Sequence, residues 1–174
     1  MTGIATPGSF NIKVKGLAQA QTVQIGSGVD GNQALPKDAT MGAAGSLKLT
    51  KGGKTVDIEI LSGDTLTKVA SKINDANTGV QASVITNADG SERLMLRSKE
   101  SGKANEFTVD IAPAADAPTD SNLRLLGQKT THEAQNAVVE LNGVEVESAS
   151  NTFASTIPGM SFSVQPDEIV GIAD

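Results

Sequence analysis

The sequence has 174 residues, with 20 acidic and 14 basic side chains and no cysteine, and its formal net charge is −6. Without cysteine, disulfides, zinc-thiolate sites and thiol nucleophiles are excluded. We also expect no Lys/Arg cluster on any one face, which argues against nucleic acid as a partner, since phosphate neutralisation dominates such affinity. Four Phe and no Trp or Tyr leave burial to Val, Ile, Leu and Ala, which favours two small cores.

No stretch approaches the ~20 consecutive apolar residues that span a bilayer. The first ten residues, MTGIATPGSF, also lack the basic and apolar segments of a Sec signal peptide. We therefore expect no membrane insertion.

Two apolar alternations open the chain. In SFNIKVKGLA, the residues from 10 to 14 alternate apolar and polar side chains, which predicts a strand with one buried face. Val23 and Ile25 predict a second short strand segment, which extends the first or turns back on it. Residues 26–45 are rich in glycine and show no period, which predicts a connector or an exposed excursion.

The segment SLKLTKGGKTVDIEI predicts a β-hairpin. A two-residue turn at Gly52-Gly53 puts the apolar residues of both arms on one face. A lysine and an aspartate then lie opposite each other on the other face, so two independent patterns support one register. That register pairs Leu49 with Val56, Leu47 with Ile58 and Lys48 with Asp57.

The segment SGDTLTKVASKINDANTG predicts an amphipathic helix. Asp64 is a plausible N-cap, because its carboxylate can accept from the amides of the first turn. Gly79 can take the left-handed conformation that ends a helix. The apolar stripe that this helix would bury consists of Leu66, Val69, Ala70, Ile73 and Ala76.

Three more strands are predicted after the helix, around residues 80–84, 94–96 and 107–111. Residues 46–111 then form a β-β-α-β-β-β unit with one helix on one sheet. Residues 112–121 contain two prolines and read as a connector, and the segment after them predicts one helical turn closed by Gly127.

The strongest hairpin prediction is AVVELNGVEVES, because Asn-Gly is the preferred type I′ pair. Its register puts Leu141 opposite Val144 and Val139 opposite Val146. A Pro-Gly turn and a strand over residues 160–164 follow, and no helix accompanies this last part.

Candidate catalytic and metal-binding residues are few. His132 is the only histidine and lies in a polar segment beside Glu133, so we interpret it as a surface or linker residue. Glu140, Glu145 and Glu147, or the segment NADGSE at 87–92, have the oxygen ligands that Ca²⁺ prefers. A solvated strand face and a simple turn are the favoured interpretations, so we predict no catalytic residue, cofactor or metal and no enzyme activity.

Three quoted stretches resemble the family of flagellar filament cap proteins, and together they cover most of the chain in the expected order. ATPGSFNIKVKGLAQAQTV is similar to the entry into the head of these proteins. VDIEILSGDTLTKVASKINDANTGVQASVITNADGSERLMLRSKESGKANEFTV resembles the repeat that they share with some flagellins. AQNAVVELNGVEVESASNTFASTIPGMSFSV resembles their later segment.

The resemblance implies a structural protein that is exported through the flagellar type III system and lies outside the cell at the distal tip of the filament. There the family forms a ring-like homo-oligomer that retains flagellin and helps it fold and insert. The implied partners are therefore copies of itself and flagellin. A second interpretation is adhesion to host mucin or another glycan, and a third is a flagellin or junction protein with the same repeat.

The family's heptad-rich terminal helices have no counterpart here, so the sequence resembles the head alone, and we expect it to be monomeric or weakly associating and unable to cap filaments by itself. The predicted fold class is α+β, mostly β, in two small domains. The resemblance implies that one domain is inserted into the other, so that the β-only domain is discontinuous and is formed by residues 1–25 and 130–174. The inserted α+β domain spans 40–128, with connectors at 26–45 and 112–121.

Overall fold

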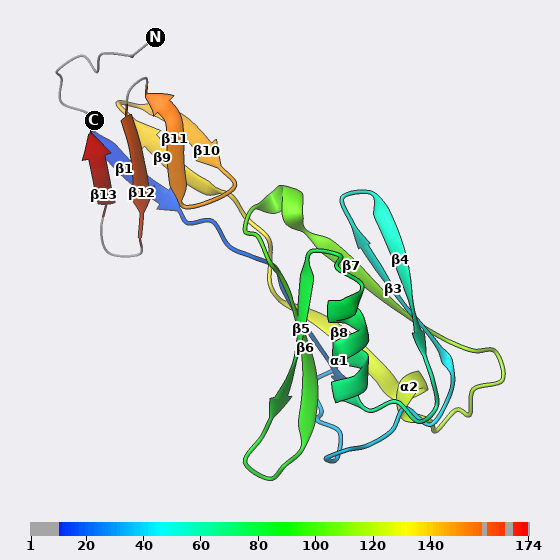
Figure 1. Cartoon of the computed structure of the whole chain (residues 1–174). Helices are drawn as coiled ribbons and strands as arrows, with labels where there is room; N and C mark the ends of the chain where they lie inside the picture. Colours follow the sequence, from blue (N-terminus) through cyan, green and yellow to red (C-terminus); the bar gives the residue numbers. More distant parts are fainter. Residues whose placement is uncertain (1–10, 158–159, 166–168, 174) are drawn as a thin grey trace.

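The computed structural model describes residues 11–157, 160–165 and 169–173, and it contains two domains that lie end to end (Figure 1). The helix domain runs from β2 (Thr22–Ser27) to β8 (Leu126–His132). The β-only domain contains β1 (Ile12–Gly16) and the strands that follow β8. Each domain has its own cluster of buried hydrophobic side chains. The predicted class, mostly β with one main helix in two small domains, is confirmed.

The helix domain contains two sheets with the main helix beside them. One sheet has the strand order β5-β6-β2-β8 and the other the order β4-β3-β7. The predicted chain order of strands and helix is observed, but its five strands belong to two sheets and not to one. The further elements are β3 (Gly45–Lys51), β4 (Lys54–Ile60), α1 (Leu66–Asp75), β5 (Val80–Thr86), β6 (Glu92–Ser98), η1 (Lys103–Asn105), β7 (Phe107–Pro113) and α2 (Asn122–Leu125).

The hairpin of β3 and β4 has the predicted register. Gly52 and Gly53 both have positive φ, at 60° and 78°, which is the backbone that a type I′ turn requires. The turn therefore fixes which residues face the core, because a slip of one residue would reverse both arms. The observed partners are Leu49 with Val56, Leu47 with Ile58 and Lys48 with Asp57.

Helix α1 buries four of the five residues of the predicted apolar stripe, Leu66, Val69, Ala70 and Ile73, while the fifth, Ala76, is its half-buried C-cap. Its N-cap is Thr65, whose hydroxyl accepts from the backbone N–H of Lys68 at 3.3 Å. Asp64 was the predicted cap, and that prediction is wrong by one residue. The Asp64 carboxylate instead accepts from the backbone N–H of Leu61 at 2.8 Å and pairs with a lysine of the helix.

The glycine-rich segment predicted as a connector at 26–45 is packed into the helix domain. Leu35, Met41 and Ala43 are buried in its core, because short bridges fix the chain against β6 and the start of α1. The second predicted connector, 112–121, likewise buries Ala117. Apolar residues do not recur at helix or strand spacing in either segment, so the sequence pattern did not indicate this burial.

Strand β2 lies in the helix domain, which differs from its expected place in the β-only domain within residues 1–25. It pairs with β6 on one side and β8 on the other, and Val23 and Ile25 join the larger core. Strand β8 contains residues 130 to 132, which the sequence also placed in the β-only domain. The crossings between domains therefore lie before β2 and after β8.

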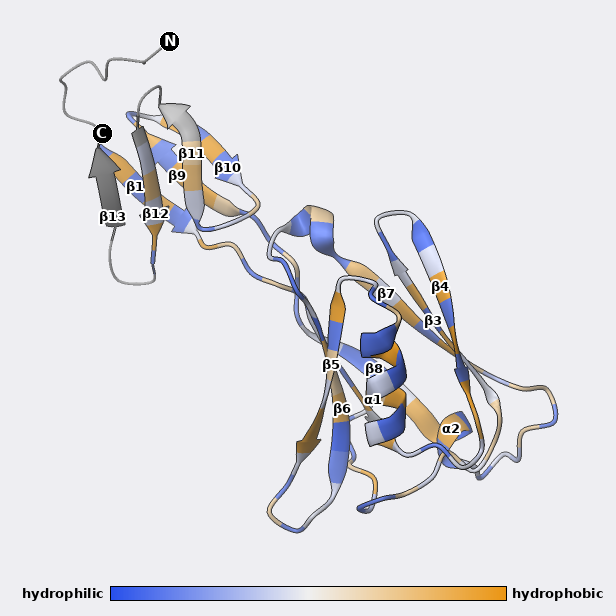
Figure 2. Ribbon diagram, viewed as in Figure 1, coloured by the Kyte–Doolittle hydropathy of each residue, from blue (hydrophilic) through white to orange (hydrophobic). Residues whose placement is uncertain are grey.

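The β-only domain is built from two three-stranded sheets, β1-β9-β10 and β11-β12-β13. Hydrophobic and hydrophilic residues alternate along β1 (Figure 2), and buried and half-buried side chains alternate along β9, so one face of this sheet is buried. Phe153 stacks on Phe162 with ring centroids 5.0 Å apart. The strands are β9 (Ala137–Leu141), β10 (Val144–Ser148), β11 (Thr152–Ile157), β12 (Met160–Val164) and β13 (Ile169–Ala173).

The Asn142-Gly143 hairpin is as predicted, with both residues at positive φ, 50° and 87°. It pairs Leu141 with Val144 and Val139 with Val146. Asn142 also fixes the start of β1, because its side-chain Oδ1 accepts from the backbone N–H of Asn11 at 2.8 Å. The predicted Pro-Gly turn at 158–159 and the beginning of the first predicted strand at Phe10 lie outside the described residues.

Candidate functional site

The chain crosses twice between the two domains, and the two crossings lie side by side (Figure 1). The backbone N–H of Gln19 donates to the carbonyl of Gln135 at 2.9 Å, and the N–H of Gln135 donates back at 3.1 Å. This isolated bridge joins the outgoing and returning segments. The domains are therefore connected by a paired double crossing, which restricts their relative motion more than a single linker would.

A loop of the helix domain around η1 is hydrogen-bonded to the β-only domain. The hydroxyl of Ser101 donates to the carbonyl of Ala149 at 2.8 Å, and the N–H of Lys103 donates to Asn136 Oδ1 at 2.9 Å. The N–H of Gly102 donates to the carbonyl of Gln19 at 3.3 Å. The hydrophobic clusters of the two domains share no residue, so these hydrogen bonds, and not a common apolar core, join the domains here.

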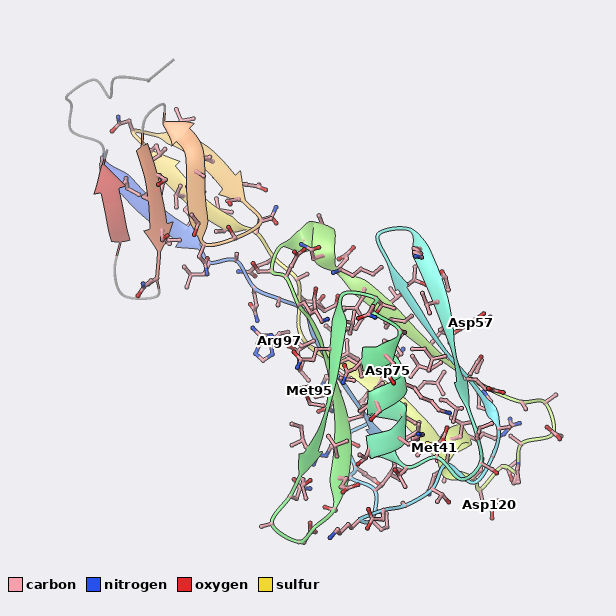
Figure 3. The ribbon with its side chains drawn as sticks, in the orientation of Figure 1. Met41, Asp57, Asp75, Met95, Arg97 and Asp120 are labelled. Carbon is pink, nitrogen blue, oxygen red and sulfur yellow. The ribbon has the colours of Figure 1, made fainter. Side chains whose placement is uncertain are left out.

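A groove of about 700 Å³ lies beside this junction, and we call it the junction groove. Three of its residues are basic, namely Arg97, Lys99 and His132, and all three are exposed. Its lining includes no acidic residue. Figure 3 shows Arg97 and Met95 on β6, at the edge of the helix domain away from Asp57 and Asp120.

Strand pairing explains why two of these basic residues, Arg97 and His132, share one face. Thr22 on β2 lies directly opposite Arg97 on β6 and His132 on β8, and partners in a sheet share a face. Two residues further, Gln24 lies between Met95 and Lys129 in the same way. The outer face of this sheet is therefore basic, although the chain as a whole is acidic. The expectation of no Lys/Arg cluster on one face is wrong.

His132 is exposed at the end of β8 and not in a linker. Glu133, its neighbour in the sequence, does not line the junction groove. His132 shares the junction groove with Arg97, whereas Glu133 lines a different groove.

The carboxylates weighed as calcium ligands have other partners. Glu140 and Glu145 each lie 3.1 Å from the ammonium of Lys15, and their hydrogen bonds raise the pKa of that lysine. In the segment 87–92, Asp89 Oδ1 accepts from the hydroxyl of Ser91 at 2.6 Å and from its N–H at 2.9 Å, and these bonds lower the pKa of Asp89. This segment is a turn.

Across the described residues, no three His, Cys, Asp or Glu side chains are grouped so that they could hold a metal ion. Within the same ranges, no helix combines the length and the apolar character needed to cross a membrane.

Among the described residues, the best-buried ion pair is structural. The ammonium of Lys72 on α1 lies 2.5 Å from Asp64 Oδ2 and also donates to the carbonyl of Glu59 at 3.0 Å. Burial opposes ionisation of the Asp64 carboxyl, but the hydrogen bonds from Leu61 and Lys72 outweigh it and lower its pKa below the ordinary value. The pair therefore joins the helix to the end of β4.

Comparison with known proteins decides the family. The flagellin hook IN motif matches residues 46–100, from β3 through α1 to the end of β6. Flagellar hook-associated protein 2 of Escherichia coli K12 is 31% identical over 164 residues, which cover 87% of this chain and 33% of that protein. The chain is a homologue of flagellar hook-associated protein 2. It spans about a third of the length of the curated relatives that it matches.

Solved structures extend the similarity to hook-associated protein 2 over both domains. The D2-D3 domains of the flagellar cap protein FliD from E. coli match with a TM-score of 0.73 at 27% identity, covering 98% of this chain and 90% of that one. FliD from Pseudomonas aeruginosa PAO1 matches with a TM-score of 0.72 at 22% identity, which shows the fold alone. The fold described above is therefore the D2-D3 fold of the cap protein.

Proposed function

We propose that this chain forms the outer part of a flagellar filament cap, at the distal tip of the filament outside the cell. There it promotes the retention, folding and insertion of flagellin subunits. The observation that carries the proposal is the similarity to hook-associated protein 2, which covers 87% of the chain in the sequence comparison and 98% in the structural one, and therefore both domains. A match to one repeat alone would not carry it, because that motif covers only residues 46–100.

The geometry suits a structural role. Two small domains lie end to end and are fixed to each other by paired crossings and hydrogen bonds, which is the arrangement expected of a stiff building block (Figure 1). The proposed partners are further copies of the chain and flagellin, and the proposed route out of the cell is the flagellar type III system. We propose no catalytic reaction for it.

The test is an in-frame deletion of residues 8–170 from the gene that encodes them. We expect short or absent filaments and unpolymerised flagellin in the medium, because subunits would escape before insertion. Detection of the shortened protein outside the cell is the control for its export. Normal filament length with normal export would overturn the cap proposal and would instead favour display of this region as an adhesion module.

A further inference from the structure

Within the part of the chain that the structure describes, the basic residues of the junction groove lack acidic partners. Among the described residues, Arg97, Lys99 and His132 have no carboxylate within 4.0 Å and donate no side-chain hydrogen bond. Arg97 and Lys99 bring two positive charges to one concave site, where their fields add and attract anionic groups, and the imidazole of His132 can donate a hydrogen bond to such a group. The groove is therefore electrostatically suited to a negatively charged segment of another molecule.

One exposed segment of the chain has the complementary character. The loop between β7 and α2, residues 114–121, has exposed Asp116 and Asp120 and contains no basic residue. Its conformation is fixed by turns, since the N–H of Ala117 donates to Ala114 at 3.0 Å and the N–H of Ser121 to Pro118 at 3.1 Å. A segment that is already ordered loses little entropy on binding.

The acidic loop and the junction groove lie on different sides of the helix domain. Figure 1 shows the loop projecting from the side with β3 and β4, and Figure 3 shows Asp120 far from Arg97. A copy therefore cannot fill its own groove with its own loop. The groove's volume falls in the range of pockets for small ligands, roughly 300–1,000 Å³, so it has room for a few side chains of a loop.

We propose that the junction groove of one copy binds the acidic loop of a second copy. In this contact Asp116 and Asp120 face Arg97, Lys99 and His132, and the contact is head-to-tail. A heterologous contact of this kind generates a ring if its rotation closes. The inference rests on the proposed function, because it names the surfaces by which the cap subunits would meet.

Cross-linking tests the contact directly, because the chain has no cysteine of its own. The variants Thr119→Cys in the loop and Ala20→Cys in the groove are mixed and mildly oxidised, with different tags to identify the mixed dimer. The contact raises the local concentration of the two thiols, so we expect about tenfold more mixed dimer than in the control pair. The control pairs Thr119→Cys with Thr55→Cys on β4. Equal yields from the two pairs would overturn the proposal.

Charge reversal provides a second test by sedimentation velocity at low ionic strength. We expect Arg97→Glu or Asp120→Lys alone to weaken self-association about tenfold, because each places like charges together. An equimolar mixture should regain association, since the intact groove of one variant meets the intact loop of the other. Lys54→Glu has the same change in charge as Arg97→Glu but lies outside the groove, and it should associate as the unaltered chain does.

The contact is refuted if Arg97→Glu and Lys54→Glu behave alike. That outcome concerns only the surface, because filament assembly by the unaltered gene would still support the cap role. Conversely, normal filaments after the deletion of residues 8–170 would refute the cap role, while the cross-link would still report on self-association.

Discussion

Gly102 lies so close to Ala149 that no larger residue fits at position 102 without movement. A Cβ atom on Gly102 would stand 2.7 Å from the Cβ of Ala149 and 2.8 Å from its carbonyl oxygen. Gly102 also has φ of 101°, which disfavours other residues. The contact joins the η1 loop of the helix domain to the β-only domain, so one glycine controls how closely the domains approach.

Substituting Gly102→Ala should loosen the junction. The added methyl group displaces the loop, so the hydrogen bonds from Ser101 and Lys103 should weaken, and hydrogen exchange at the Lys103 amide should become faster. Gly143→Ala is the matched control, since Gly143 also has positive φ but a Cβ atom added there would have no neighbour within 4 Å. It should cost only the backbone strain, about 1–2 kcal/mol. Unchanged exchange at Lys103 in Gly102→Ala would contradict the role of this contact.

The buried face of α1 should dominate the stability of the helix domain. Ile73 is fully buried, so Ile73→Ala should lower the free energy of unfolding by about 2–5 kcal/mol. Ile73→Asp should unfold the domain. Lys68→Ala lies on the exposed face of the same helix and should change stability by less than about 0.5 kcal/mol. Thermal melts of the three variants check this, and an unchanged melting temperature for Ile73→Asp would be inconsistent with the observed packing.

Asp64→Asn should destabilise the chain by about 1–3 kcal/mol, because it removes the charge that binds half-buried Lys72 and weakens the bond from Leu61. Chemical denaturation measures the difference. Asp75→Asn is the control, since Asp75 is an exposed carboxylate on the same helix. Equal stability of the two variants would mean that the pair contributes little.

The same carboxylate predicts a pH dependence. The pKa of Asp64 is lowered in the folded chain. In the unfolded chain an aspartate has a pKa of about 3.9, so as the pH falls the unfolded chain takes up the proton first. The contribution of Asp64 is therefore complete above about pH 5 and is lost as the pH falls through the folded pKa. Denaturation curves of the unaltered chain and of Asp64→Asn should converge in acid. A constant difference across this range would contradict the assignment.

Asn74 protects the free edge of β5. Its side chain accepts from the backbone N–H of Ala82 at 2.8 Å and donates to the carbonyl of the same residue at 3.0 Å, as a neighbouring strand would. Asn74→Ala should cost about 1–3 kcal/mol, because two half-buried backbone groups lose their partner. It should also increase aggregation, since an open edge can pair with another chain. Light scattering compares it with Gln81→Ala, an exposed position on β5.

The sequence predicted the features that depend on neighbours along the chain. The turns at Gly52-Gly53 and at Asn142-Gly143 define their registers through the backbone conformations that glycine and asparagine permit, so both hairpins were correct in detail. The buried face of α1 could also be predicted, because the helical spacing of apolar residues is visible within ten residues of sequence. The predicted N-cap was wrong by one position, because Asp64 and Thr65 are both good capping residues. Only the pairing of Asp64 with Lys72 in the folded structure distinguishes them.

Features that depend on strands far apart in the sequence could not be predicted from it. Val23 and Ile25 read as a strand, but nothing near them in the sequence indicates that β6 and β8 are their neighbours. The burial of Met41 in a glycine-rich segment left no periodic signal. The junction groove was missed for the same reason, since Arg97 and His132 come together only through their shared partner Thr22.

The pairing of β1 with β9 has a consequence for the order of folding. Asn11 and Asn142, which join the two strands at one end, are 131 positions apart in the chain. During synthesis the whole helix domain leaves the ribosome before the partner of the first strand exists. Closing so long a loop is slow, and contacts of this separation lower folding rates. We therefore expect a kinetic intermediate in which the helix domain is folded and β1 has not yet paired with β9.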